Sequence, residues 1–245
     1  MSAQVCEGKV ALVTGANRGL GRAFVQELLA AGASKVYAAA RDPGSIDLST
    51  GLAEASAVST VVPVRLDVTN PDEVSAAAKI CADVDLVINN AGILRGAPIA
   101  SFGDVHELRA EMDTNFFGTL AVSNAFAPVL KARGGGALVN ILSVLSWVSL
   151  PGTALYSASK AAAWSLTNAL RKELREQGTL VVGVHVGYMD TDMVAGVQAP
   201  KSQPADVARQ VLRAIAIGQE EVLADEISRQ VKAGLSSDSP AYLAA

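Results

Sequence analysis

Residues 14–21 read Thr14-Gly15-Ala16-Asn17-Arg18-Gly19-Leu20-Gly21 and directly follow a short apolar, β-branched run, Val10–Val13. The glycine spacing is G-x-x-x-G-x-G, which differs from the G-x-G-x-x-G fingerprint but meets similar physical demands. Positions without a Cβ permit a tight turn, and a helix starting near Gly19 points free N–H groups and its positive dipole end at a pyrophosphate. The segment therefore predicts a strand, a phosphate-binding turn and a helix; an ordinary glycine-rich loop is the alternative.

Apolar, β-branched runs alternate with helical patterns along the rest of the chain. The expected strands are Val10–Thr14, Lys35–Ala40, Val61–Leu66, Asp85–Asn89, Ala137–Leu142, Leu180–Val186 and Glu221–Ala224. The expected helices are Arg22–Ala31, Pro71–Ala82 with Asn70 as N-cap, Asp104–Lys131 as one long helix or a kinked pair, Ala154–Gln177 and Pro204–Ile217. Strands separated by helices imply parallel pairing, and strands without polar alternation imply helices on both faces. The pattern predicts an α/β fold, a doubly wound, Rossmann-like parallel sheet of about seven strands, in a single domain over residues 1–245.

The composition excludes several classes of protein. Of 245 residues, 50% are hydrophobic, which is enough to bury one sizeable core. A net charge of -4 without a dense basic run argues against nucleic acid as a partner. Cys6 and Cys81 are isolated, as expected of reduced thiols. The uncharged stretch Gly134–Ser159 contains glycines and Pro151 that would break a membrane helix, so we expect a cytoplasmic protein without membrane contact.

A tyrosine and a lysine stand one helical turn apart in the segment Tyr156-Ser157-Ala158-Ser159-Lys160. Hydride transfer to a carbonyl leaves an alkoxide that must gain a proton, and the donor needs a pKa not far above the working pH. A free tyrosine titrates at about 10. Because Lys160 lies on the same helix face, its charge favours the Tyr156 phenolate. Together with the glycine turn, the pair indicates hydride transfer coupled to proton transfer.

Other catalytic groups are few. Ser143 ends the fifth strand, at the carboxyl edge where such sheets bind ligands, and its hydroxyl can polarise a carbonyl; Ser146 is a nearby alternative. His106 and His185 are the only histidines, and neither has metal-ligand spacing with Cys or acids, so we expect no metal. His185, inside the sixth strand, is expected to be a satisfied core residue. The sequence has no G-x-S-x-G elbow, so a hydrolase triad is unsupported.

These motifs together resemble the short-chain dehydrogenase/reductase family in its compact single-domain form. Residues 14–21 resemble its cofactor loop, and Asn89-Asn90-Ala91-Gly92 resembles its strand-four motif. Four residues match the order and spacing of its catalytic tetrad: Asn115, Ser143, Tyr156 and Lys160. The resemblance covers about residues 9–191, most of the chain.

The resemblance implies a role for each of the four. Tyr156 is expected to act as the acid in reduction and as the base in oxidation. Lys160 is expected to hold the nicotinamide ribose hydroxyls as well. Ser143 positions the substrate carbonyl, and Asn115 completes a water-linked proton path to Lys160. A lone helical asparagine is otherwise more often a local hydrogen-bonding residue.

The end of the second strand favours NADP(H) over NAD. Ala40 stands where NAD-preferring relatives carry an acid, and Arg41 follows it. A guanidinium fits a 2′-phosphate bidentately, and Arg18 is a second candidate for that contact. Arg41 as a solvated charge paired with Asp42 is the alternative.

The remaining cofactor contacts are implied by the resemblance. Asp67 is expected at the adenine amino group and Val68 on the ring, although Asp67 as a cap or turn residue is the alternative. Val186-Gly187 replaces the usual Pro-Gly, which affects the nicotinamide pocket. The residues expected at the cofactor are Gly15, Asn17, Arg18, Gly19, Leu20, Gly21, Arg41, Asp67, Val68, Asn90, Ala91, Gly92, Tyr156, Lys160, Gly187, Met189 and Thr191.

We expect an open, apolar substrate pocket over the carboxyl ends of the fourth to sixth strands. Its expected lining residues are Leu94, Leu145, Trp147, Tyr188 and Met193, with a short lid over about residues 192–203. Such a lining favours hydrophobic ketones or aldehydes over charged acids. Small residues along the helix from Ala154 allow another helix to approach closely. The family that the chain resembles commonly pairs this helix between subunits, so we expect a homodimer or homotetramer.

Three functions are compatible with these motifs. The leading one is an NADPH-dependent carbonyl reductase, reversible as an alcohol dehydrogenase. The second is an NADP(H)-binding redox sensor or regulator without turnover; it needs the glycine turn but not the Tyr156 and Lys160 relay. The third is a sugar-nucleotide epimerase of the extended relatives, for which the chain is short.

Overall fold

The computed structural model describes residues 6–47, 60–96 and 105–243. Within these ranges seven parallel strands form one sheet in the order β3-β2-β1-β4-β5-β6-β7. The strands are β1 (Val10–Thr14), β2 (Lys35–Ala40), β3 (Thr60–Arg65), β4 (Leu86–Asn89), β5 (Ala137–Ile141), β6 (Leu180–His185) and β7 (Glu221–Leu223). The structure confirms the predicted doubly wound sheet, and each strand end lies within one residue of its predicted place.

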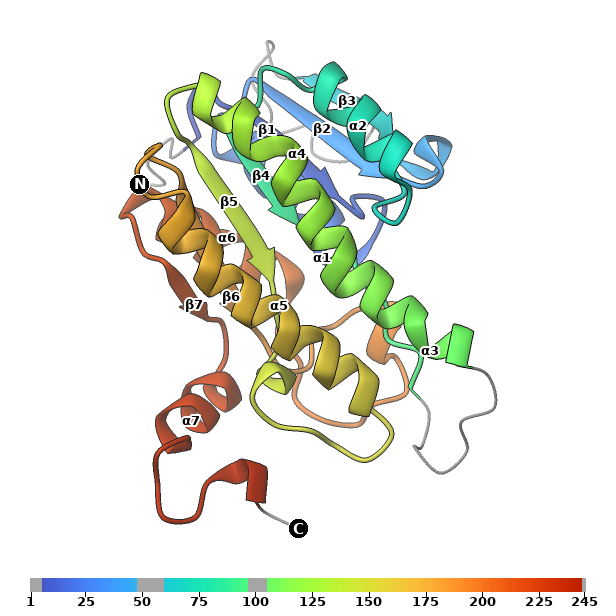
Figure 1. Cartoon of the computed structure of the whole chain (residues 1–245), viewed down its shortest axis with the longest axis vertical. Helices are drawn as coiled ribbons and strands as arrows, with labels where there is room; N and C mark the ends of the chain where they lie inside the picture. The colour runs from blue at the N-terminus through green and yellow to red at the C-terminus, as the bar shows by residue number, and fades with distance from the viewer. Residues whose placement is uncertain (1–5, 48–59, 97–104, 244–245) are drawn as a thin grey trace.

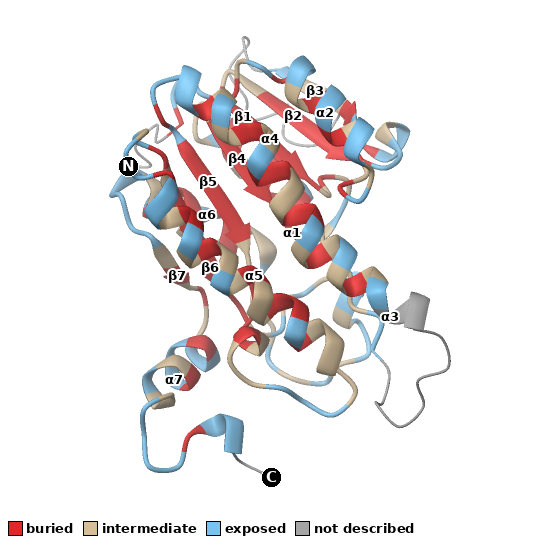
Figure 2. Ribbon diagram, in the orientation of Figure 1, coloured by how far each residue is buried: buried red, intermediate tan, exposed pale blue. Residues whose placement is uncertain are grey.

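Helices cover both faces of the sheet (Figure 1). The helices are α1 (Gly19–Ala30), α2 (Pro71–Ile80), α3 (Val105–Met112), α4 (Thr119–Ala132), α5 (Ala154–Glu173), α6 (Pro204–Ala216) and α7 (Glu226–Gly234). Alternate strand residues point to opposite faces. Ala11 and Val13 pack with α1 and α6, whereas Val10 and Leu12 pack with α2, α4 and α5. Figure 2 shows the result: the strands are buried, and the outer sides of the helices are exposed.

Several helix boundaries follow from local chemistry. Asn70 caps α2, since its Oδ1 accepts hydrogen bonds from the N–H groups of Asp72 and Glu73, as predicted. α1 begins at Gly19, where the glycine turn predicts a helix start, rather than at Arg22, where the helical pattern of apolar residues begins. α5 ends at Glu173 rather than at the predicted Gln177.

Of the two alternatives predicted over Asp104–Lys131, one long helix or a kinked pair, the structure shows a joined pair. α3 continues into α4 through a π-helical segment, Asp113–Gly118, while Asp104 itself lies outside the described residues. The sequence analysis did not predict α7. This helix is short and is capped by Asp225, whose Oδ1 accepts the Ser228 N–H at 2.9 Å.

Candidate active site

The strand order reverses between β1 and β4, and the loops that follow these two strands meet there. Parallel sheets bind ligands at this switch point, outside the carboxyl ends of the strands. In Figure 1 this edge is the lower end of the sheet, toward which β5 points. It brings together the glycine turn, the segment after β4 and the start of α5.

The glycine turn needs its glycines for backbone reasons. Gly15 and Gly19 have φ angles of +64° and +53°, in the left-handed region that favours glycine. A Cβ on Gly21 would collide with the Gly15 carbonyl and lie 2.6 Å from Asn90 Nδ2. No side chain caps α1, since Arg18 at its N-cap position makes no capping bond. Among the residues that the structure describes, no side chain therefore binds the first N–H groups of α1, which suits an anion.

Asn90 and Thr14 lock the two loops together. Asn90 Nδ2 donates to the carbonyl oxygens of Thr14 at 2.9 Å and Gly15 at 3.2 Å. Thr14 Oγ1 in turn accepts the N–H groups of Asn90 and Ala91, both at 3.0 Å. Asn90, predicted at the cofactor, thus uses its amide nitrogen to hold the turn. Sequence reasoning missed Thr14, although its place at the end of a strand beside the turn is a usable signal.

The predicted proton-transfer residues converge from β5 and α5. Lys160 is buried, and its Nζ donates to the Ile141 carbonyl at 2.8 Å and lies 5.7 Å from the centre of the Tyr156 ring. Ser143 is buried just beyond β5, where its Oγ accepts the Leu145 N–H at 3.1 Å and starts a 3-10 turn, Val144–Ser146. The Ser143 Oγ also donates to the Val186 carbonyl at 3.4 Å, and the Ser143 side chain lowers the pKa of the Tyr156 phenol.

Asn115 lies in the π-helical segment and is almost fully buried. Its Oδ1 accepts the Ile93 N–H at 2.9 Å, and its Nδ2 donates to the Ile93 carbonyl at 2.9 Å and to Ser159 Oγ at 3.0 Å. A Cβ built on Gly92 would lie 3.2 Å from Asn115 Oδ1 and 3.7 Å from Lys160 Nζ. The two side chains thus flank Gly92, and π-helical turns are frequent at functional sites.

Burial dominates the ionisation of the central pair. It raises the pKa of Tyr156 to about 12, an effect that the Ser143 side chain partly offsets and the Glu111 charge increases. Burial also lowers the pKa of Lys160 to about 8. The sequence argument expects Lys160 to favour the phenolate, but desolvation of Tyr156 outweighs that attraction. Tyr156 is therefore protonated at neutral pH, as an acid in reduction must be.

Of the side chains predicted at the adenine end of the cofactor, some already have hydrogen-bond partners within the protein and others have none among the described residues. Arg41 is exposed at the end of β2 and has no ion-pair partner among the described residues. The Asp42 carboxylate instead accepts the Gly44 N–H at 2.9 Å, so the pairing of Arg41 with Asp42 is not observed. Asp67 Oδ1 accepts the N–H and hydroxyl of Thr69 at 2.9 and 2.7 Å, as a turn residue does.

Two further residues of the predicted cofactor set are buried. Val68 packs against Gly118, where an added Cβ would lie 2.6 Å from Val68 Cγ2. The Leu20 side chain is in the core between the sheet, α1 and α6. Leu20 can therefore offer a ligand only its backbone, as expected for a residue in the first turn of α1.

The segment after β6 folds back over the glycine turn. The Gly187 N–H donates to Asp225 Oδ2 at 2.6 Å, and Thr191 Cγ2 lies 3.2 Å from where a Cβ on Gly19 would stand. Met189 pairs with Ser202, which closes residues 189–202 into a loop with one 3-10 turn, Asp192–Val194. Asp192 also forms an exposed ion pair with Arg18 at 3.3 Å.

The predicted substrate residues differ in how far they are exposed. Leu94, Leu145 and Trp147 are half-buried, whereas Tyr188 and Met193 are exposed.

The Trp147 ring stacks on His185, with ring centres 3.8 Å apart. His185 Nδ1 lies 3.1 Å from the Ser143 carbonyl, a contact that sequence reasoning missed, and Nε2 has no hydrogen-bond partner among the described residues. Burial lowers the pKa of His185 to about 4, so the ring is neutral at pH 7.

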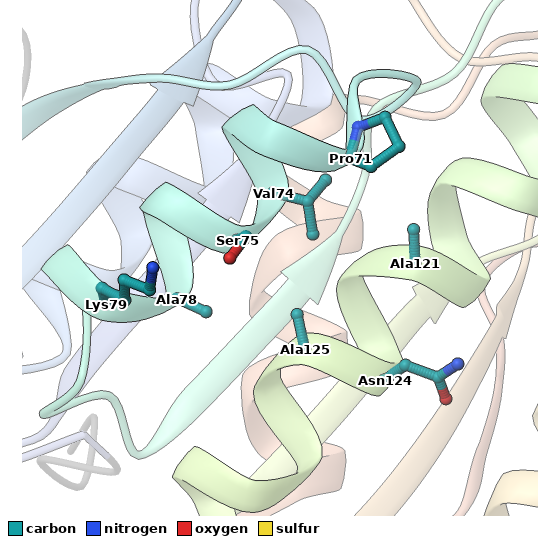
Figure 3. A pocket seen from close by; sticks show the side chains of 8 residues that line it. All are labelled: Pro71, Val74, Ser75, Ala78, Lys79, Ala121, Asn124 and Ala125. Atoms are coloured by element: carbon teal, nitrogen blue, oxygen red, sulfur yellow. The ribbon is translucent and has the colours of Figure 1, made fainter.

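A surface groove of about 510 Å³ lies away from these residues, between α2 and α4 (Figure 3). It is lined by Pro71, Val74, Ser75, Ala78, Lys79, Ala121, Asn124 and Ala125. None of the sequence-predicted site residues lines it.

Within the described part of the chain, no group of three or more His, Cys, Asp or Glu side chains is placed to hold a metal ion. No helix among the described residues is long and apolar enough to cross a membrane.

The doubly wound sheet with a glycine turn at its switch point defines a dinucleotide-binding type of α/β protein. A family model for the short chain dehydrogenases matches residues 9–202. An uncharacterized oxidoreductase of Staphylococcus aureus (strain USA300) is 34% identical over 218 residues, which cover 86% of this chain and 92% of the relative.

Solved structures agree with this match. A short chain dehydrogenase from Burkholderia cenocepacia J2315, in complex with NADP, is 41% identical with a TM-score of 0.87, covering 95% of this chain and 94% of that one. A short chain dehydrogenase/reductase from Burkholderia phymatum, in complex with NAD, is 26% identical with a TM-score of 0.80, covering 94% and 92%. The chain belongs to the short-chain dehydrogenase family of oxidoreductases, as its motifs predict.

Proposed function

We propose that this protein is an NADPH-dependent oxidoreductase that interconverts hydrophobic ketones or aldehydes and their alcohols. The observation that carries the proposal is the meeting of Ser143, Tyr156, Lys160 and Asn115 at the switch-point edge of the sheet. A protein that only binds a nucleotide needs the glycine turn but has no use for a half-buried phenol beside a buried amine.

The residues at this edge fit a dinucleotide. The uncapped start of α1 and the glycine turn, where a Cβ on Gly21 would intrude, suit a pyrophosphate. Lys160 is the candidate for the nicotinamide ribose hydroxyls, and Gly187, Met189 and Thr191 are candidates for the nicotinamide side. The bound nicotinamide supplies or accepts the hydride.

The chain's own residues then manage the proton. Ser143 Oγ holds the substrate carbonyl oxygen, and the Tyr156 hydroxyl donates its proton to that oxygen in reduction. In oxidation the phenolate of Tyr156 takes the alcohol proton. Lys160 stabilises that phenolate through its positive charge, and an oxidised nicotinamide held by Lys160 would add a second positive charge. Asn115 orients the segment around Gly92 and links Lys160 toward water.

The preference for NADPH rests on Arg41. This guanidinium is exposed at the end of β2 and is not engaged by Asp42, so it is available for a 2′-phosphate. Arg18, which pairs with Asp192, is the second candidate. Asp67 and Val68 are the candidates for the adenine. The Burkholderia cenocepacia relative holds NADP, which supports the same choice, although the Burkholderia phymatum relative holds NAD.

The substrate class rests on the apolar side chains around the loop. We assign the pocket to Leu94, Leu145, Trp147, Tyr188 and Met193, with residues 192–203 as a short lid that has a single 3-10 turn. Bulky apolar carbonyls fit such a lining better than charged acids.

The assembly follows from α5. Its exposed small residues Ala158, Ser165 and Ala169 leave a face on which a second copy can pack closely, so we propose a homodimer or homotetramer.

The test is an activity screen. The protein is mixed with NADPH or NADH and a matched series of aromatic and aliphatic ketones, keto acids and acyl thioesters, and nicotinamide absorbance is followed. Turnover of hydrophobic ketones with NADPH supports the proposal. Binding of NADPH without turnover of any member points to the sensor instead, and a preference for a small charged keto acid contradicts the apolar pocket.

A further inference from the structure

Glu111 is a buried carboxylate that the proposed reaction does not use. It lies in α3 near the end of the helix, and only 4% of the residue is exposed. Acids are almost never buried to this extent unless they have a partner. Asn115 follows one helical turn later, so the two side chains come from the same stretch of chain.

The partner of Glu111 is the loop that follows β4. Its Oε1 accepts the Arg95 N–H at 2.6 Å. Asn115 binds both the N–H and the carbonyl of Ile93, which precedes Arg95 by two residues. The two side chains therefore fix the backbone on either side of Leu94, the first of the residues assigned to the substrate pocket.

Glu111 also acts on Tyr156. α3 and the π-helical segment both pack against α5, which carries Tyr156 and Lys160. The Glu111 charge disfavours the Tyr156 phenolate and so raises the pKa of that phenol. The charges that act on Tyr156 are thus the Glu111 carboxylate from α3 and the Lys160 ammonium, whose Nζ lies 5.7 Å from the ring on the same helix; the neutral Ser143 side chain, just beyond β5, acts on it as well.

We propose that Glu111 is a positioning residue of this site: it fixes the loop after β4 through the Arg95 amide and sets a buried negative charge against the Tyr156 phenol. The catalytic consequence rests on the proposed function, but the two contacts do not. The charge adds to the larger effect of burial, which keeps Tyr156 protonated before reduction, and it opposes the positive charge of Lys160.

Two substitutions separate the two contributions. Glu111→Gln keeps an acceptor for the Arg95 N–H and removes the charge. Glu111→Asp keeps the charge and withdraws the acceptor by one methylene. Asp113→Asn is the matched control, because it removes one charge from the same helical stretch at an exposed position.

The effect of the Glu111 charge is tested by measuring the pH at which Tyr156 ionises. The measurement is NMR of the protein with carbon-13-labelled tyrosine in the presence of NADP⁺. Tyr156→Phe identifies the Tyr156 signal. Removing a nearby negative charge favours the phenolate, so Glu111→Gln should ionise Tyr156 at a pH lower by roughly one unit. Asp113→Asn should move it by much less. Equal shifts in the two variants, or no shift in Glu111→Gln, would overturn the electrostatic half of the proposal.

The hydrogen bond from the Arg95 N–H to Glu111 is tested by amide hydrogen exchange over residues 93–96. Glu111→Asp should speed exchange at Arg95 by at least tenfold, whereas Glu111→Gln should leave it near that of the unaltered protein. Unchanged exchange in Glu111→Asp would overturn the positional half. Neither measurement requires turnover. If the protein reduced no carbonyl, the proposed function would be wrong, but the two measurements would still test the role of Glu111.

Discussion

Asn90→Ala tests whether the two loops at the switch point depend on a single amide. The substitution removes the hydrogen bonds from Nδ2 to the carbonyl oxygens of Thr14 and Gly15, at 2.9 and 3.2 Å. Each such bond contributes about 0.5–1.5 kcal/mol net, so the free energy of unfolding should fall by roughly 1–3 kcal/mol. The glycine turn then loses its hydrogen bonds to the segment after β4, so NADPH should bind more weakly.

The measurement is urea unfolding of wild type and variant, with NADPH affinity by fluorescence titration. The midpoint should fall while the denaturant slope stays the same, because the substitution hardly changes the surface that unfolding exposes. Asn124→Ala is the matched control, because Asn124 is exposed on α4. If Asn90→Ala were as stable as Asn124→Ala and bound NADPH normally, the locking role derived from these contacts would be wrong.

Three further predictions concern the cofactor, the chemistry and pH. Arg41→Ala should weaken NADPH binding by roughly 1.5–3 kcal/mol and NADH binding much less, because one charge-assisted phosphate contact is lost; calorimetry showing equal losses would refute this. Tyr156→Phe should abolish turnover with NADPH still bound, whereas Lys160→Ala should lose turnover and weaken the cofactor; substantial residual rate in Tyr156→Phe would end the proton-transfer assignment. The pKa of His185 is lowered to about 4 from an ordinary value of about 6.5. Between these two pH values the imidazole is protonated in the unfolded chain but not in the folded protein. The free energy of unfolding should therefore fall as the pH drops from about 6.5 to 4. A shift of this size corresponds to roughly 3 kcal/mol, and unfolding curves of His185→Gln should lack that part of the pH dependence.

Much of the fold is a local property of the sequence. Buried parallel strands such as Lys35–Ala40 are continuous apolar runs, and nothing distant is needed to recognise them. The cap at Asn70 and the left-handed turn at Gly15 are equally local, because a side chain meets its own backbone or a φ angle excludes a Cβ. α7 was not predicted because it is only nine residues long and few of those residues are apolar.

The motifs also identified the family and the order of the four candidate catalytic residues, because they depend on spacing along one chain. The tertiary structure decided what each of those residues meets. Asn90 holds Thr14 across a separation of 76 residues, and His185 reaches the Ser143 carbonyl from a neighbouring strand. Glu111 has no motif around it, and its bond to Arg95 exists only because α3 packs beside the loop after β4. Periodicity and turn chemistry act between near neighbours, whereas strand order and helix packing determine which distant side chains share one low-dielectric site, and so how each of them ionises.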